Sequence, residues 1–237
     1  MPMNSRPTNP MDWTAPAGLI AVGLLLCGVF LRYPRGAIPG GAGPILASGV
    51  ALAVFAAWAV LTWRGSRRPA PAFRNSGRQF GVAVGLGCGA LWVLEISFNN
   101  FVDPSLSTAS SRLYVDDGTW ALVAVLILLA SFRIARRGGF GSGVRVGAWS
   151  GFVSGLVSCL MALVLVNFLM PFLLRDPLNI EEYKAQTNAP DMATYFAYET
   201  TAGALGHLLV LGCAMGALLG AAGGALGSLM RVRTPAP

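Results

Sequence analysis

Charged residues are scarce in this chain of 237 residues. Asp, Glu, Lys and Arg make up 11% of it, whereas hydrophobic residues make up 54%. Soluble domains carry roughly 25% charged residues, so the composition excludes an ordinary soluble domain. The formal net charge is +7, but the basic residues are dispersed between apolar runs and form no nucleic-acid-binding face. The composition therefore indicates an integral membrane protein.

Residues and motifs that carry chemistry are equally few. His207 is the single histidine, which excludes a multi-histidine metal centre, and no HExxH motif is present. The sequence has no GxxxxGK[ST] loop and no GxSxG motif, and its Gly85-Leu86-Gly87 lies within an apolar run rather than after a strand. We therefore expect no enzyme activity, no cofactor and no bound metal.

Cysteine is also rare, and its placement argues against disulfides. The four cysteines fall in four different apolar runs and form no CxxC pair: Cys27, Cys88, Cys159 and Cys213. None of them lies in a predicted external loop, where an oxidising compartment would favour pairing. The sequence predicts buried free thiols.

The apolar runs predict an all-α polytopic membrane bundle of six transmembrane helices. The predicted spans are residues 17–31, 45–63, 80–98, 120–134, 146–174 and 200–230. Residues 1–16 are expected to be a disordered N-terminus, residues 231–237 are a short tail, and the first run is interpreted as an uncleaved helix. Pro171 predicts a bend in the fifth helix, and Asp191 is a candidate N-cap in the acidic loop 176–199.

The basic residues predict the orientation. With six spans, 12 Lys and Arg residues fall on the side of the two termini and 5 on the other side. The positive-inside rule then places both termini in the cytoplasm, here of a bacterial inner membrane. Arg32 and Arg35 are exceptions on the outer side, whereas every acidic residue except Asp12 lies on or near that side. Trp120 is expected at the outer interface, and Trp92 deeper in its span.

Glycines recur at every fourth residue in three runs. The series are Gly77, Gly81, Gly85, Gly89; Gly143, Gly147, Gly151, Gly155; and Gly212, Gly216, Gly220, Gly224. Four residues are close to one helical turn, so each series lines one helix face and allows close helix–helix contact. The series at 77–89 and 143–155 are offset by 66 residues. This offset indicates either a parallel repeat or two glycine-rich helices of similar composition.

One candidate polar site emerges from the depth of ionisable residues in their spans. Glu95 lies about 9 Å and His207 about 11 Å below the predicted outer surface, at 1.5 Å per residue. Asn99, Asn100 and Asn167 lie at or just above that level. Ionisable groups in a span usually face the bundle interior, so we expect an outward-opening polar pocket in which Glu95 and His207 can share a proton. For each residue taken alone the structural interpretation is favoured, with Glu95 reaching the headgroups and His207 bonding a backbone carbonyl, and the shared depth adds weight to the pocket.

The sequence favours a structural or assembly subunit that acts through glycine-lined helix interfaces. Its partners would be membrane lipids and other membrane proteins or further copies of the chain, and no nucleic acid. The alternative is a transporter for an ion or a small molecule, coupled or not to protons, with the polar pocket as the start of its path. A glycine face left over for another chain would favour the first function.

Overall fold

A computed structural model describes residues 14–33, 72–185 and 190–230, and these residues are helical apart from short connections. Five helical stretches among them are long and apolar enough to cross a membrane: Thr14–Arg32, Gly77–Phe101, Ala109–Gly138, Phe140–Phe168 and Met192–Leu229. The chain thus has the organisation of an all-α, multi-pass membrane protein. The predicted span at 45–63 lies outside the described residues.

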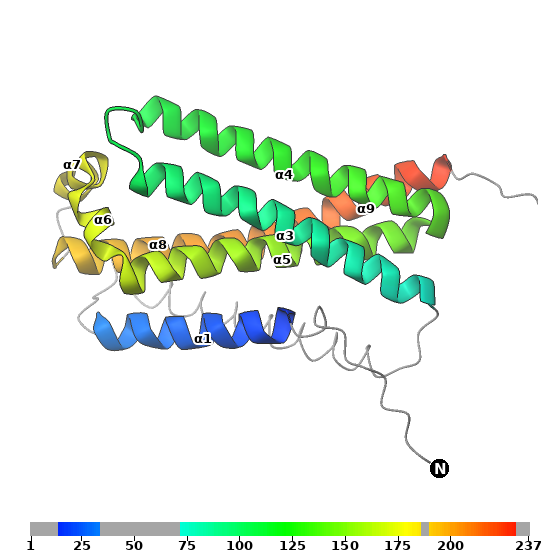
Figure 1. Ribbon diagram of the computed structural model, residues 1–237, viewed down its shortest axis with the longest axis horizontal. Coiled ribbons are helices and arrows are strands. Elements are labelled where there is room, and N and C mark those ends of the chain that lie inside the picture. Colours follow the sequence, from blue (N-terminus) through cyan, green and yellow to red (C-terminus); the bar gives the residue numbers. More distant parts are fainter. Residues whose placement is uncertain (1–13, 34–71, 186–189, 231–237) are drawn as a thin grey trace, which may run out of the picture.

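The described helices are arranged as one elongated bundle (Figure 1). They are α1 (Thr14–Arg32), α3 (Ala72–Phe101), α4 (Ala109–Gly138), α5 (Phe140–Phe168), α6 (Met170–Arg175), α7 (Pro177–Ala185), α8 (Met192–Leu209), the π-helix η2 (Val210–Met215) and α9 (Gly216–Leu229). Helices α8, η2 and α9 form one continuous rod. Helices α1, α3 and α5 run in one direction, and α4 and the α8–α9 rod run in the other.

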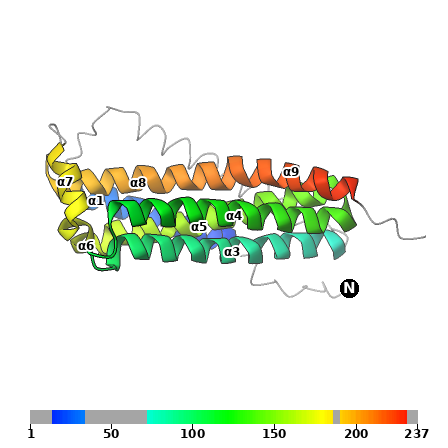
Figure 2. The ribbon, with the colours of Figure 1, turned by 90° about the horizontal axis from the view of Figure 1, so that it is seen from above.

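Helix α5 is the centre of the bundle. It packs against α1, α3, α4 and the α8–α9 rod, and Figure 2 shows α3 and the rod on opposite sides with α4 and α5 between them. The buried share of its apolar span is 67%, against 22% to 41% for the other four spans. A helix that is apolar on all sides, as α5 is, belongs in such a position.

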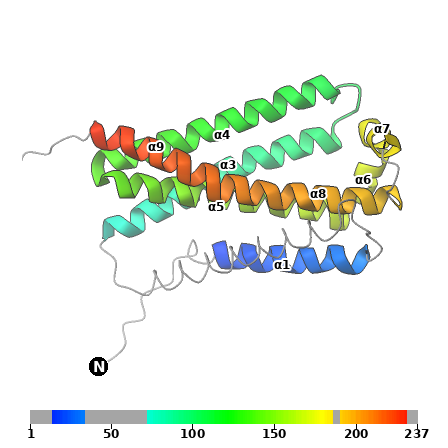
Figure 3. The same cartoon turned by 180° about the vertical axis from the view of Figure 1, so that it is seen from behind.

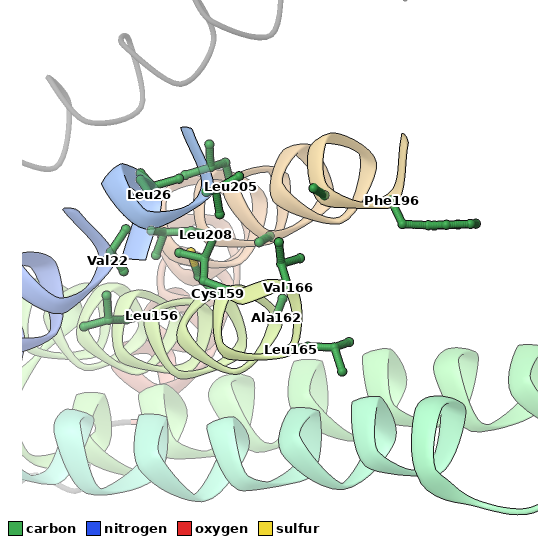
Figure 4. Close-up of a cluster of buried hydrophobic side chains, with 14 of the residues drawn as sticks. Val22, Leu26, Leu156, Cys159, Ala162, Leu165, Val166, Phe196, Leu205 and Leu208 are labelled. Carbon is green, nitrogen blue, oxygen red and sulfur yellow. The ribbon is translucent and has the colours of Figure 1, made fainter. Parts of the chain in front are cut away.

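The main core lies along the second half of α5, where α1 runs beside it (Figure 3). Val22 and Leu26 of α1 meet Leu156 of α5, and Leu205 and Leu208 of α8 complete the contact (Figure 4). These side chains are almost fully buried. Side chains of α1, α5 and α8 thus fill the space between three helices.

Glycines lie where α5 meets the rod. A Cβ atom added to Gly143 would lie 2.6 Å from the Cα of Gly224, and one added to Gly151 would lie 2.6 Å from the Cα of Gly216. Gly147 faces Gly220 in the same way, and a Cβ on Gly212 would lie 3.3 Å from the Cα of Phe152. Because the helices are antiparallel, the α5 glycines meet the rod glycines in reverse order. The two backbones approach more closely than any side chain would permit.

The opposite side of α5 meets glycines of α3. A Cβ on Gly81 would lie 2.9 Å from the Cβ of Trp149, and one on Gly85 would lie 2.7 Å from the carbonyl oxygen of Ser150. At the α4–α5 turn, Gly139 has φ of +79°, a backbone conformation that favours glycine. This turn lets two long helices follow each other directly.

The helices extend beyond the predicted spans. Helix α4 begins at Ala109 rather than at 120, with the Thr108 side chain accepting a hydrogen bond from the Ser111 N–H as N-cap. Part of the predicted loop 176–199 is also helical, as α7 and the start of α8. The Asp191 N-cap is confirmed, since its carboxylate accepts from the Thr194 N–H at 2.8 Å.

The predicted fifth span is interrupted. Helix α5 ends at Phe168, Leu169 leaves the helical conformation, and α6 begins with Pro171 in its first turn. Proline is tolerated there because the first N–H groups of a helix have no intrahelical partner. The break falls where the bend was predicted.

Charge divides the two ends of the bundle. All described acidic residues lie in the half that contains α6 and α7, which we call the acidic end: Glu95, Asp103, Asp116, Asp117, Asp176, Glu181, Glu182, Asp191 and Glu199. The other half, the basic end, contains Arg78, Arg133, Arg136, Arg137 and Arg145. Arg32, an exception in the charge count, lies at the acidic end and donates to the carbonyl oxygen of Asn167 at 2.6 Å. A cation there stabilises the C-terminus of α5.

The described cysteines are free thiols. Cys88 and Cys159 are buried, as expected, but Cys27 is exposed on the surface of α1. The prediction of burial was wrong for Cys27 because it assumed that every residue of a span faces the core. Cys27 lies one residue from Leu26, which occupies the inward face.

Candidate functional site

Glu95 is a buried carboxyl group inside a helix that is long and apolar enough to span a membrane. Glu95 is 7% exposed. Its Oε1 accepts a hydrogen bond from the side-chain amide of Asn99, one helical turn further along α3. A charged group at such a position is costly unless it is paired or faces an interior path. The amide of Asn99 supplies part of that compensation.

Asp116 of α4 lies at the same level of the bundle as Glu95. The indole rings of Trp92 and Trp120, whose centroids are 4.9 Å apart, set the register between α3 and α4. Because these helices are antiparallel, the next turn toward the acidic end brings Glu95 level with Asp116. Asp116 lies one helical turn before Trp120, whose ring contacts His207.

His207 enters the same region from α8. Its ring centroid lies 5.1 Å from that of Trp92 and 5.1 Å from that of Trp120, both in edge-to-face geometry. Its Nδ1 lies 3.3 Å from the Oγ of Ser158 on α5. The Nε1–H of Trp92 in turn donates to the Oγ of Ser154 at 3.1 Å. Four helices thus converge on the imidazole.

We call this set the polar site. It comprises Trp92, Glu95 and Asn99 of α3, Asp116 and Trp120 of α4, Ser154 and Ser158 of α5, and His207 of α8. Glu95 belongs to the site because it lies level with Asp116, and His207 belongs to it because its ring contacts Trp92. They do not bond each other, since Glu95 is paired with Asn99 and His207 with Ser158.

Two predicted residues lie elsewhere. Asn100 donates to the carbonyl oxygen of Ile96 in its own helix at 2.8 Å. Asn167 faces α1, where its amide donates to the carbonyl oxygen of Leu25 at 3.1 Å, as well as to Leu163 at 2.8 Å. The structure therefore does not bring these two asparagines to the polar site.

Asp116 and Trp120 were not predicted as site residues, because the start of their helix was placed at residue 120. With residues 109–119 assigned to a loop, Trp120 was placed at the membrane interface. The structure shows that α4 continues for eleven residues before Trp120, about 17 Å of helix, and that the Trp120 ring packs against Trp92 and His207. The signal was present, since Asp116, Trp120, Val123 and Ile127 follow the helical spacing of one inward face.

A salt bridge lies one turn beyond Asp116, toward the acidic end. Arg112 of α4 pairs with Asp176 at 2.7 Å, and its Nε also donates to the Oγ of Ser107 at 2.8 Å. Asp176 is 5% exposed and accepts from the N–H of Leu178 at the start of α7. This contact joins the α3–α4 loop to the segment that carries α6 and α7.

The loop itself contains one acidic residue with a perturbed pKa. Hydrogen bonding from Ser105 lowers the pKa of Asp103, and the Ser105 N–H lies 2.9 Å from its Oδ1. Asp103 is fully exposed, so it remains charged near neutral pH. It adds to the negative charge of the acidic end.

The polar site gathers ionisable groups between long apolar helices. It combines two carboxyl groups, an imidazole, two hydroxyls and two indole rings, all supplied by different turns of four helices. Such a group can exchange protons. Among the described residues, no group of three or more His, Cys, Asp or Glu side chains could hold a metal ion. Comparisons with protein-family models, curated protein sequences and solved structures found no match.

Proposed function

We propose that this chain carries an ion or a small solute across the membrane by way of the polar site. The observation that carries the proposal is Glu95, which is 7% exposed within a candidate span and lies level with Asp116 of α4. Ionisable groups within spans are costly and mark ion or substrate paths. A purely structural bundle would be more stable with apolar residues at these positions.

The glycines support this preference over an assembly subunit. An assembly role through glycine faces needs a face that remains available to another chain. Gly147 and Gly151 instead lie against Gly220 and Gly216 of the same chain, and Gly81 and Gly85 lie against α5. The glycines then serve as the scaffold that holds the helices around the polar site.

The proposed topology has six spans, with both termini in the cytoplasm of a bacterial inner membrane and the acidic end facing outward. Helix α1 ends at the acidic end and α3 begins at the basic end, which supports one further crossing between them. The arginines of the basic end support a cytoplasmic position for it.

Cysteine labelling tests this orientation. In a background without native cysteines, Glu182→Cys on α7 is expected to react with an impermeant maleimide added to intact cells. Arg137→Cys at the basic end should react only after the membrane is opened. Both positions are exposed in the folded chain, so accessibility reports the side of the membrane. The opposite pattern would reverse the orientation.

A flux assay tests the proposed function. The purified chain is placed in vesicles that contain a pH-sensitive or a sodium-sensitive dye, and gradients of H⁺, Na⁺ or K⁺ are imposed. Glu95→Gln, which keeps the shape and the contact with Asn99 but removes the charge, is expected to reduce flux at least tenfold. The control is Asp117→Asn, an exposed carboxyl on the same helix as Asp116, which should leave flux unchanged.

Equal flux in the wild type and Glu95→Gln would remove the site from the path. Absence of flux above protein-free vesicles under every gradient would leave the assembly function as the better proposal.

A further inference from the structure

The contacts of His207 differ from those of a histidine that serves only in packing. A packing histidine usually donates a ring N–H to a backbone carbonyl. The carbonyl oxygen can only accept a hydrogen bond, so the bonded ring nitrogen must carry a proton. His207 instead meets the Ser158 hydroxyl at Nδ1 and two indole rings at 5.1 Å. These groups suit both protonation states of an imidazole.

Each of these contacts can persist when the His207 ring gains a proton. The Ser158 hydroxyl donates to Nδ1 when that nitrogen is unprotonated and accepts when it carries a proton. An indole face attracts a cation within about 6 Å of its centroid, and the centroids of Trp92 and Trp120 both lie within that distance of the imidazole. The neutral ring makes ordinary aromatic contacts with the same two side chains. Gaining a proton therefore requires no rearrangement.

The charged groups around His207 are both acidic. Helix α4 contributes Asp116, and α3 contributes Glu95, one turn beyond Trp92. Helix α5 presents the uncharged hydroxyls of Ser154 and Ser158. Arg112, one turn before Asp116 on α4, is paired with Asp176. An adjacent carboxylate such as that of Asp116 favours the charged imidazole, whereas burial of the ring opposes it.

We propose that His207 is a reversible proton-binding site and that the ion carried through the polar site is H⁺. Asp116 is a positioning residue that stabilises the charged imidazole. Trp92 and Trp120 form the wall that holds it within the membrane. This inference rests on the proposed transport function for its physiological meaning, but proton binding at His207 can be measured without transport.

Tryptophan emission provides the measurement. A variant with Trp13, Trp58, Trp63 and Trp149 replaced by Phe keeps only the two indoles that contact His207. An imidazolium quenches a neighbouring excited indole more than a neutral imidazole does. Emission from the full chain in lipid nanodiscs is expected to fall through one single-proton transition as pH is lowered. His207→Gln, whose amide can still bond Ser158, should abolish that transition.

A second variant keeps the proposal testable should His207→Gln fail to fold. Asp116→Asn removes a negative charge that favours the imidazolium, so the midpoint should move to lower pH by about one unit. Asp117 is the exposed neighbour of Asp116, and Asp117→Asn is the matched control. Its midpoint should differ from that of the wild type by only a small fraction of the shift in Asp116→Asn. An unchanged transition in His207→Gln, or no shift in Asp116→Asn, would overturn the proposal.

The outcomes separate this inference from the proposed function. A transition that depends on His207 without any ion flux would reject transport and retain the proton site. Flux that requires Glu95 without such a transition would retain transport and reject His207 as the proton-binding group.

Discussion

Gly151→Leu is expected to prevent stable folding of the bundle. The added Cβ alone would lie 2.6 Å from the Cα of Gly216 and 3.0 Å from its backbone nitrogen. A clash with a flexible side chain can be relieved by rotation, but here the neighbouring atoms are backbone and must move with their helix. Overpacking typically costs 1–3 kcal/mol, and this site lies at or above the top of that range. Against a total stability of about 5–15 kcal/mol, such a loss is severe.

The measurement is the amount of monodisperse protein in mild detergent and its midpoint of thermal unfolding. Gly216→Leu, on the facing helix, should behave like Gly151→Leu. Gly87→Leu is the matched control, because Gly87 lies on the exposed face of α3 with no described atom within 4 Å of an added Cβ. That change should be neutral or slightly stabilising, as leucine favours helix more than glycine does. Equal behaviour of Gly151→Leu and Gly87→Leu would mean that α5 and α9 are not in close contact.

Trp92→Ala is expected to have the second-largest effect on stability. The side chain is fully buried, packs edge-to-face on Trp120 and donates to Ser154. Its removal leaves a large cavity between α3, α4 and α5 and an unpaired hydroxyl, a loss of about 3–5 kcal/mol for a buried aromatic residue.

Reversible unfolding in mixed detergent measures this loss. Trp92→Phe should recover a large part of the stability, because it restores most of the volume but not the hydrogen bond. Leu94→Ala serves as the control, since Leu94 is 66% exposed on the same helix and should contribute little. A Trp92→Ala variant as stable as Leu94→Ala would contradict the packing of the polar site.

Sequence periodicity could predict the helices but not all of their ends. The apolar runs located the described spans because burial in a membrane needs about 20 apolar residues. The start of α4 was missed because residues 109–119 are polar. Their helix is supported by the Thr108 cap and by the pairing of Arg112 with Asp176, which is a contact distant in the sequence. Contacts of this kind leave no local pattern.

The depth of a residue along its helix was also predictable, because the rise per residue is fixed. The prediction of the pocket did not consider the direction in which each side chain points around the helix axis. Asn99 follows Glu95 by four residues and shares its face, but Asn100 follows by five and points about 140° away. Asn167 follows Ser158 by nine residues, which is two and a half turns. It therefore faces α1 on the opposite side of α5.

The most direct test of the transport proposal is the charge that the purified chain moves across a membrane. Vesicles containing the protein are adsorbed to a solid-supported membrane and exposed to a step in H⁺ concentration, with Na⁺ and K⁺ steps for comparison. The transport proposal predicts a transient current in the wild type and in Asp117→Asn that is lost in Glu95→Gln, with all three proteins equally folded. A current of the same size in Glu95→Gln, or none in the wild type under any step, would contradict the account.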